Sequence, residues 1–491
     1  MHSADAAWLR MDRAENLMAI TSVLWFEQPL PLEPLRALLR ARLVDRFPRF
    51  TQRVVDGGLL GGPHWEDDEA FDLDLHVHHV ALPAPGGRAE LQELVSDLMA
   101  TPLDRTKALW HVHVVDGYEN GSALVTRMHH CIADGIALAR VMLSLTDPSP
   151  DAGEPSIDLT DNDRERGLLA RAAGPLAPAL GAGRSVAGAL VHGGAETLRH
   201  PRRVGKLPGE AAGVLRALAK ELTLPADPIG PLRGELHPGQ RVAWCSPVPL
   251  ADVKRIARAH DATVNDVLVS AVTGGLRRWM LAADPLPADG GRGPLLEREI
   301  NAMVPFNLRP LDQPLPRELG NRFGLVLLPL PLLEADPVAR LGEVHRRMLE
   351  IKDSPEGAVS YGVLGAMGLS PPAVEAQLID LFSSKATLVL TNVPGPRAPV
   401  YLAGAQLRGV LVWAPCAGSV STSVSIFSYD GQVSVGFMVD AGLVPDPDAI
   451  VRAVDAELAA LLPPVGVRPP PRRAVSRTAR RESADEPRVA R

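Results

Sequence analysis

The residues of this chain with the clearest capacity for chemistry are two adjacent histidines that precede an aspartate and a glycine. The stretch reads His129-His130-Cys131-Ile132-Ala133-Asp134-Gly135. A positioned, neutral imidazole can accept a proton from a hydroxyl group and return it to a leaving group, which is general base catalysis. Asp134 directly precedes a helical pattern, so its carboxylate is expected to cap the first turn of that helix.

The elements on either side place the histidines at the end of a strand. Residues 123–127 form an apolar run typical of a strand, and residues 138–145 repeat apolar side chains with the spacing of one helix face. Successive side chains of a strand point to opposite faces. Only one of His129 and His130 can therefore face a given cavity, and the other has to pack or hydrogen-bond behind it.

Composition argues against several classes of protein. The chain has 491 residues, of which 46% are apolar, enough for two sizeable cores. Its net charge is −7, and no excess of lysine and arginine covers the body, so nucleic acid is not an expected partner. Cys131, Cys245 and Cys416 lack C-x-x-C spacing, which indicates a reducing compartment and argues against a disulfide framework. Cys131 is expected to be a buried small side chain rather than a nucleophile.

The chain shows no pattern expected of a secreted or membrane-spanning protein. No window offers 18 uncharged apolar residues, and residues 1–5 do not begin a signal peptide. We therefore expect a cytoplasmic protein, peripheral to the inner membrane or to lipid inclusions. Residues 166–222 are rich in Ala, Gly and Leu and predict broken helices, whereas the Pro- and Arg-rich residues from 465 onward predict disorder.

Further histidines alternate on two predicted strands. His76 and His78 share one face of the first strand, and His111 and His113 repeat the pattern in the next. A metal site built from them is conceivable, but no carboxylate or cysteine sits at a recurring ligand spacing. We therefore expect no metal and interpret these residues as histidines of half-exposed strands.

The second half of the chain carries its own polar motif. Thr263 and Asp266 have the spacing of a capping box at the start of a helix. Asn265 would lie in the first turn, beside unpaired backbone N–H groups. It is therefore a candidate for holding a polar substrate atom, although a purely capping role is the default interpretation of the pattern.

Taken together, these motifs resemble the bacterial wax ester synthase/acyl-CoA:diacylglycerol acyltransferase family. The resemblance covers nearly everything from Asp5 to Leu462. Its markers occur in the family's order: Asp5-Ala6-Ala7-Trp8-Leu9, His129 to Gly135, Asn265-Asp266, Asn392 to Pro396, Ser428 to Gly431 and Val444-Pro445-Asp446. The histidine motif alone is shared with condensation domains and plant alcohol acyltransferases, and the later motifs narrow the choice. One departure is Ala108, where the family usually has proline before Leu-Trp.

The resemblance implies an α/β fold of two domains, like chloramphenicol acetyltransferase. Mixed sheets with flanking helices would enclose an active-site tunnel between the domains. The expected division is an N-terminal domain at 1–150, a helical crossover at 151–236, a C-terminal domain at 237–463 and a disordered tail at 464–491.

The resemblance also implies the reaction and the roles of its residues. A long-chain acyl group would pass from acyl-CoA to diacylglycerol or to a fatty alcohol, with no cofactor beyond acyl-CoA as co-substrate. His130 would be the general base, supported by His129. Asp134 and Gly135 would be structural, with Arg309 as the hypothesised partner of Asp134. Asn265, followed by Asp266, would lie near the tetrahedral oxyanion.

Two alternatives remain open from the sequence. One is another acyltransferase with the same histidine motif, which acts on a polyketide-like alcohol or uses a carrier-bound acyl donor. The other is a non-catalytic protein at a lipid-droplet or membrane surface that has kept the fold. An intact His130 and Asp134 argue against the second, because a scaffold needs neither of the two histidines.

Overall fold

The computed structural model describes most of the chain. The described residues are 1–57, 62–151, 223–283, 298–307, 316–352, 354, 356–367 and 372–462. The predictions made for Arg309, for the broken helices at 166–222 and for the tail lie outside these residues.

Within the described residues, six strands form a first sheet in the order β12-β13-β1-β6-β5-β4. All neighbours are antiparallel except β4 and β5. The strands are β1 (Ala19–Phe26), β4 (Val77–Ala81), β5 (Trp110–Tyr118), β6 (Gly121–His129), β12 (Tyr401–Leu402) and β13 (Ala405–Trp413). The hairpin of β5 and β6 delivers His129 at its last residue, as the sequence predicts.

A second sheet has the order β10-β9-β11-β14-β15-β7 along the described chain, with β8 beside β15. Strand β11 runs parallel to both β9 and β14, so the sheet is mixed. The strands are β7 (Gln240–Trp244), β8 (Val248–Pro249), β9 (Ile300–Asn307), β10 (Phe323–Leu330), β11 (Leu388–Pro394), β14 (Thr422–Tyr429) and β15 (Gln432–Asp440). A separate small hairpin pairs β2 (Gln52–Val55) with β3 (His64–Asp67).

The two sheets do not divide the chain at a single residue. β12 and β13 come from the region after residue 237, yet β13 pairs with β1 along its length and completes the first sheet. A division by residue number alone therefore separates these two strands from the sheet that they extend.

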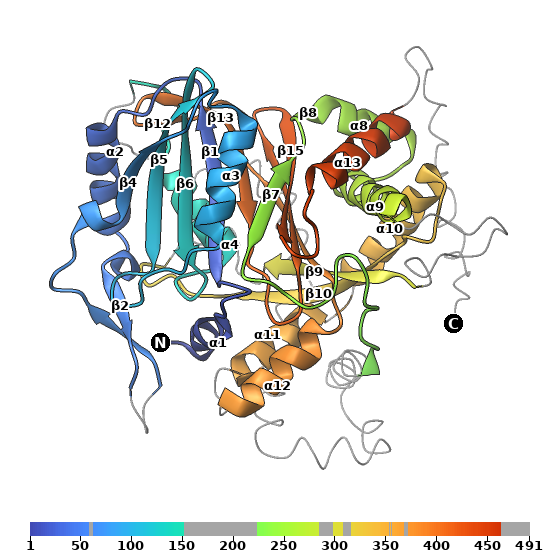
Figure 1. Cartoon of the computed structure of the whole chain (residues 1–491), viewed down its shortest axis with the longest axis horizontal. Coiled ribbons are helices and arrows are strands. Elements are labelled where there is room, and N and C mark those ends of the chain that lie inside the picture. Colours follow the sequence, from blue (N-terminus) through green and yellow to red (C-terminus); the bar gives the residue numbers. More distant parts are fainter. Residues whose placement is uncertain are drawn as a thin grey trace, which may run out of the picture.

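Helices pack on the faces of the two sheets and beside their ends (Figure 1). Those of the first half are α1 (Ser3–Met11), α2 (Leu32–Leu39), α3 (Arg88–Met99) and α4 (Gly135–Ser144), with the short turns η1 (Arg40–Val44), η2 (Pro48–Phe50) and η4 (Leu73–Leu75). Those of the second half are α8 (Leu250–Ala259), α9 (Val264–Ala283), α10 (Pro337–Lys352), α11 (Glu356–Met367), α12 (Pro372–Ser383) and α13 (Asp448–Leu461). Glu457 of α13 bonds to Arg278 of α9 and to Arg340 of α10, which ties three helices together.

Three hydrophobic clusters account for the described core. One lies between the first sheet and helices α1, α2 and α4, and a second lies between the other sheet and helices α8, α9, α10 and α13. The third joins the sheets, with Trp244 of β7 against Trp413 of β13 at 6.2 Å between ring centroids. Because this junction is a buried apolar interface, the two sheets behave as one packed unit.

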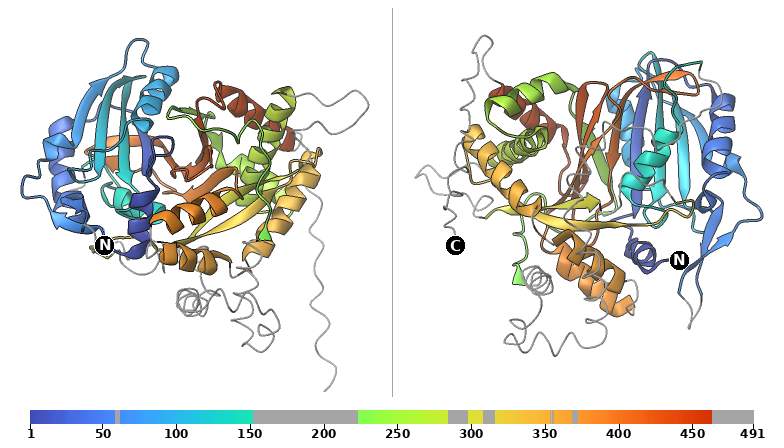
Figure 2. Two further views of the ribbon diagram at one scale, coloured as in Figure 1. Left: turned by 60° about the horizontal axis from the view of Figure 1, so that its bottom comes forward. Right: turned by 180° about the vertical axis from the view of Figure 1, so that it is seen from behind.

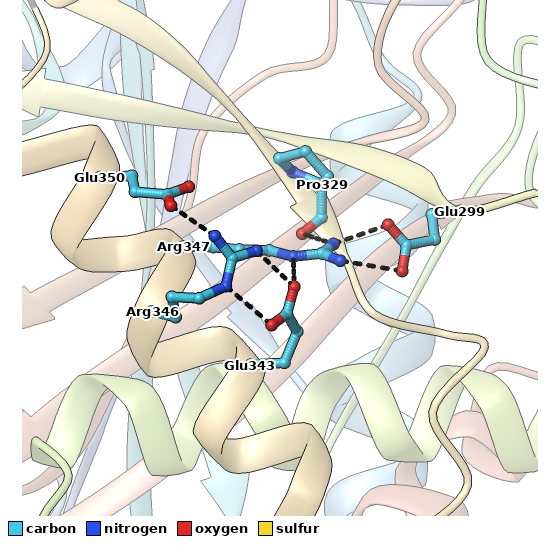
Figure 3. A network of polar contacts seen from close by, with 6 residues as sticks. All are labelled: Glu299, Pro329, Glu343, Arg346, Arg347 and Glu350. Atoms are coloured by element: carbon cyan, nitrogen blue, oxygen red, sulfur yellow. Dashed lines mark hydrogen bonds and ion pairs between the residues drawn. The ribbon is translucent and has the colours of Figure 1, made fainter.

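Charged side chains fasten α10 to the strands beneath it (Figure 3). The guanidinium of Arg347 binds both carboxylate oxygens of Glu299 at 2.7 and 3.1 Å and donates to the carbonyl of Pro329 at 2.9 Å. Arg346 pairs with Glu343 and Glu350 on the same helix. Among the helices of the described residues, none combines the length and apolar character needed to cross a bilayer.

Candidate active site

The histidine motif forms the tight connection between β6 and α4. Strand β6 ends at His129, and α4 begins at Gly135 with Asp134 as its N-cap. The carboxylate of Asp134 accepts the backbone N–H of Ala137 at 2.8 Å, so the predicted cap is confirmed. A Cβ added to Gly135 would meet no atom within 4 Å, so packing does not demand a glycine there.

His130 lies in a fully enclosed aromatic setting. Its ring stacks on Trp8 with 4.1 Å between centroids and 20° between planes, and Phe323 lies 5.4 Å away. Burial lowers the pKa of His130 to about 3. The imidazole is therefore neutral at ordinary pH, and a base has to be neutral to accept a proton.

His129 faces a different environment, as the strand geometry predicts. Its Nδ1 accepts the backbone N–H of Cys131 at 3.1 Å, which places the proton of a neutral ring on Nε2. That Nε2 lies 3.8 Å from the carboxylate of Asp12. Burial acts to raise the pKa of Asp12, but its contacts with His129 and other donors outweigh burial and hold the pKa at about 2. This arrangement fits a supporting role for His129.

A turn from the second half closes over the motif. The carbonyl of Ile132 accepts the N–H of Gly320 at 3.1 Å, and Asp134 accepts the N–H of Arg322 at 3.0 Å. Gly320 has φ of +97°, which side-chain-bearing residues rarely adopt. The side-chain amide of Asn321 donates to the carbonyl of His130 at 2.8 Å. Asp134 thus joins the two halves through a backbone group, while Arg309 lies outside the described residues.

Removing the Asp134 carboxylate is expected to destabilise the protein. Asp134→Ala leaves the buried N–H of Ala137 and the partly buried N–H of Arg322 without these acceptors, so the free energy of unfolding should fall by about 1–3 kcal/mol. Urea denaturation of the two proteins measures the difference. Asp134→Asn keeps one acceptor and is expected to fall between them, and equal midpoints for all three proteins would exclude the structural role.

The second polar motif forms contacts of its own. Thr263 and Asp266 exchange backbone-to-side-chain hydrogen bonds at 2.8 and 3.2 Å, which confirms the predicted capping box. Asp266 also binds His345 at 2.7 Å. Asn265 accepts from the amide of Asn392 at 2.5 Å, so two motifs that are far apart in sequence meet. Among the described residues, no hydrogen bond joins Asn265 to His130, and its oxyanion role stays a prediction.

An apolar cavity begins two residues before His130. Strands β1, β6 and β13, helix α4, Pro396 and Phe427 enclose about 590 Å³, counting the part open to solvent. Met128 lines it, and its lining residues are apolar apart from Ser22, Thr126 and Thr146. The hydroxyls of Ser22 and Thr126 satisfy each other at 2.5 Å.

The remaining candidate nucleophiles and ligands do not assemble into a site. Burial raises the pKa of the Cys131 thiol well above its usual value, so it is an inert core side chain as predicted. The rings of His78, His111 and His113 lie 4.8 to 6.1 Å apart between centroids. Within the described residues, however, no three His, Cys, Asp or Glu side chains are grouped to hold a metal ion.

Comparison with known families decides the identity of the fold and of the motif. The family model of the wax ester synthase/diacylglycerol acyltransferase catalytic domain matches residues 1–268, and that of its C-terminal domain matches residues 319–462. The chain belongs to the wax ester synthase/diacylglycerol acyltransferase family. It is therefore an acyltransferase by class.

Individual relatives agree with this membership of the family. A probable diacylglycerol O-acyltransferase of Mycobacterium tuberculosis is 30% identical over 469 residues, 93% of this chain and 94% of that protein. The wax ester synthase/diacylglycerol acyltransferase of Marinobacter aquaeolei matches with a TM-score of 0.63 and 23% identity, over 93% and 97% of the two chains. The first condensation domain of the calcium-dependent antibiotic synthetase gives 0.56 and 14%, over 94% of each. These structures share the mixed α/β fold.

The family tryptophan at Trp110 is an anchor of the core. Its indole N–H donates to the carbonyl of Phe50 at 2.9 Å, and the carbonyl of Leu109 accepts the N–H of His129 at 2.9 Å. Ala108, which replaces the family's proline, is buried. This segment therefore supports the histidine motif through its backbone.

Sequence reasoning missed the side chains that surround His130. Asp5 and Trp8 belong to a family motif whose spacing assigns them no role, and the sequence does not single out Asn321. Asp5 accepts from Asn321 at 2.8 and 3.0 Å, and Asn321 in turn holds the carbonyl of His130. The features that could have marked these residues as part of the site were their positions in a family motif or beside a turn. Their contacts with His130 become visible only in the fold.

Proposed function

We propose that this acyltransferase moves a long-chain acyl group from acyl-CoA to diacylglycerol, to a long-chain alcohol, or to both, with His130 as general base. The observation that carries the proposal is a buried, neutral imidazole that comes directly after β6, two residues beyond Met128, which lines the apolar cavity. Membership of the family supports the same reaction.

The chemistry needs one base and no covalent enzyme intermediate. The neutral ring of His130 accepts the hydroxyl proton of the acceptor while its oxygen attacks the thioester carbonyl carbon. The tetrahedral intermediate collapses with loss of the CoA thiolate, which takes the proton back from the imidazolium. Ester and free CoA thiol are the products. Cys131 is not required, because burial keeps its thiol protonated.

The apolar cavity is suited to an alkyl chain. Met128 lies in its wall two residues from His130, so a chain in the cavity has its functional group near the base. Burying methylene groups there contributes about 0.8 kcal/mol each. No charged side chain of the described residues lines the cavity, so a charged acceptor has no ion-pair partner among these lining residues.

Acceptors of this kind are insoluble in water, so we also propose peripheral contact with a membrane or lipid-droplet surface. Helix α12 exposes Val374 and Leu381, at 45% and 38% of their surface, which supplies apolar side chains for such a contact. Exposed aliphatic residues of this kind favour shallow insertion rather than a membrane span.

Purified protein with palmitoyl-CoA tests the reaction directly. Free CoA thiol is measured with dipalmitoylglycerol, with hexadecanol and without acceptor, and the ester is identified after extraction. We expect acceptor-dependent thiol release with at least one of the two. The palmitoyl thioester of an acyl carrier protein serves as the comparison donor. Release from that donor alone would replace the proposal with the carrier-dependent alternative, and release from neither would reject acyl transfer.

A further inference from the structure

The ring of Trp8 stacks directly on that of His130, yet the proposed reaction assigns no role to Trp8. It lies in α1 and is 6% exposed. Its indole covers the imidazole at 4.1 Å between centroids, with 20° between the planes. A near-parallel stack at this distance is an attractive contact in addition to the area that it buries.

The stack fixes the orientation of the catalytic ring. Phe323 of β10 lies 5.8 Å from Trp8 and 5.4 Å from His130, so three rings pack together. Turning the imidazole about its χ2 torsion would break the parallel contact with Trp8 and press its edge into the indole. A base whose ring is held in this way loses little orientational freedom when it accepts a proton.

The same helix also holds the backbone of His130. Asp5 of α1 accepts both N–H and side-chain amide hydrogen bonds from Asn321, at 3.0 and 2.8 Å. The amide nitrogen of Asn321 donates to the carbonyl of His130 at 2.8 Å. Helix α1 therefore secures the ring through Trp8 and the main chain through Asp5.

Helix α1 is itself anchored by the second half of the chain. It lies beside α11 and α12 in every view (Figures 1 and 2). Arg10 binds Glu375 of α12 at 2.9 Å, and the carboxylate of Glu375 is almost completely buried. Parts of the chain that are more than 300 residues apart thus converge on one side of His130.

We propose that Trp8 is a positioning residue of the acyl transfer, which holds the imidazole of His130 in the orientation for proton transfer by stacking on it. This inference rests on the proposed function and deepens it. The indole N–H makes no hydrogen bond within the described residues. The contact that orients His130 is therefore made by the aromatic face of Trp8 and not by its N–H group.

Two substitutions distinguish the contribution of the aromatic face of Trp8 to kcat from that of its N–H group. Trp8→Phe keeps an aromatic ring and removes the N–H, whereas Trp8→Leu removes the ring. We expect Trp8→Leu to lower kcat by about 10- to 100-fold through misplacement of the base. KM for palmitoyl-CoA and for the acceptor should stay within about twofold, and Trp8→Phe should retain at least about a third of kcat.

A matched control excludes a general loss of packing. Trp25 lies in β1, stacks on Trp244 at 6.4 Å, and is about six residues, roughly 20 Å, along the strand from the end that pairs with His129. Trp25→Leu should lose thermal stability like Trp8→Leu but keep kcat. Equal kcat losses in these two variants, or a Trp8→Phe variant as slow as Trp8→Leu, would overturn the positioning role.

A second readout is independent of turnover. Diethyl pyrocarbonate modifies exposed, neutral imidazoles, and the modified peptide is quantified by mass spectrometry. Modification of His130 is expected to be several times faster in Trp8→Leu than in the parent or in Trp25→Leu. An inactive parent would reject the proposed function while leaving this test of the stack intact. Unchanged modification of His130 in Trp8→Leu would reject the stack itself.

Discussion

Replacing His130 with alanine is expected to lower kcat for acyl transfer by about 100- to 10,000-fold, the usual contribution of a general base. The ring lies two residues along the chain from Met128, which lines the apolar cavity, and burial lowers its pKa to about 3. It therefore stays unprotonated between pH 5 and 8, where an ordinary imidazole would titrate. CoA thiol release under saturating palmitoyl-CoA and acceptor measures the effect.

The neighbouring histidine provides the control. His129→Gln removes an imidazole from the same turn, where the ring contacts Asp12 and the backbone of Cys131. The expected loss of kcat in His129→Gln is smaller than in His130→Ala, because His129 supports the position of the turn and does not accept the hydroxyl proton. Thermal unfolding of both variants shows whether either loses its fold. A His130→Ala protein that stays folded and retains more than a tenth of the parent kcat would exclude the base assignment.

Local patterns predicted the elements that carry the motif. The hairpin of β5 and β6, the N-cap at Asp134 and the capping box at Thr263 and Asp266 were all read from residues close together in sequence. Each depends on interactions over a few residues, which periodicity and capping preferences express. The sequence therefore predicted where the two histidines lie and which way the chain turns after them.

Contacts between segments that are far apart in the chain could not be predicted from the sequence. Strand β13 pairs with β1 across almost four hundred positions of the chain, and nothing in its apolar pattern states which sheet it joins. The stacking of Trp8 on His130 is likewise a contact between distant segments, and no local pattern predicts it. Asp134 also accepts the backbone N–H of Arg322 across the two halves, and every residue except proline has such a group. Residue types alone therefore do not predict this contact.

Acidification from pH 7 to 5 is expected to destabilise the protein by at least about 2 kcal/mol, through histidines that the fold keeps neutral. Burial, followed by neighbouring positive groups, lowers the pKa of His111 to about 3 and that of His113 to about 4. Burial lowers the pKa of His130 to about 3. In the unfolded chain all three bind protons near pH 6.5. The unfolded state therefore gains protons first as the pH falls.

The sign and the window follow from these pKa values. A depressed histidine pKa gives stability that is complete above pH 6.5 and is lost progressively toward the folded-state pKa of 3 to 4. Each group contributes up to about 1.4 kcal/mol for every pH unit in that window. Asp12, whose pKa is about 2, changes the stability only below about pH 4 and therefore does not affect the change between pH 7 and 5.

The double variant His111→Phe/His113→Phe isolates the strand histidines from the catalytic one. Both rings lie beside His78, whose own pKa is lowered by burial, and near the buried Arg127, so each added proton would meet the positive charge of Arg127. Urea denaturation at pH 7, 6 and 5 should give a clearly shallower loss of stability in this variant than in the parent. His64→Phe on the exposed hairpin strand β3 should keep the parent slope. Parallel slopes in all three proteins would mean that His111 and His113 take up protons equally well in the folded and unfolded states. Their burial would then carry no electrostatic cost, and the acid sensitivity would have to come from the other histidines whose pKa burial lowers, His76, His78 and His130.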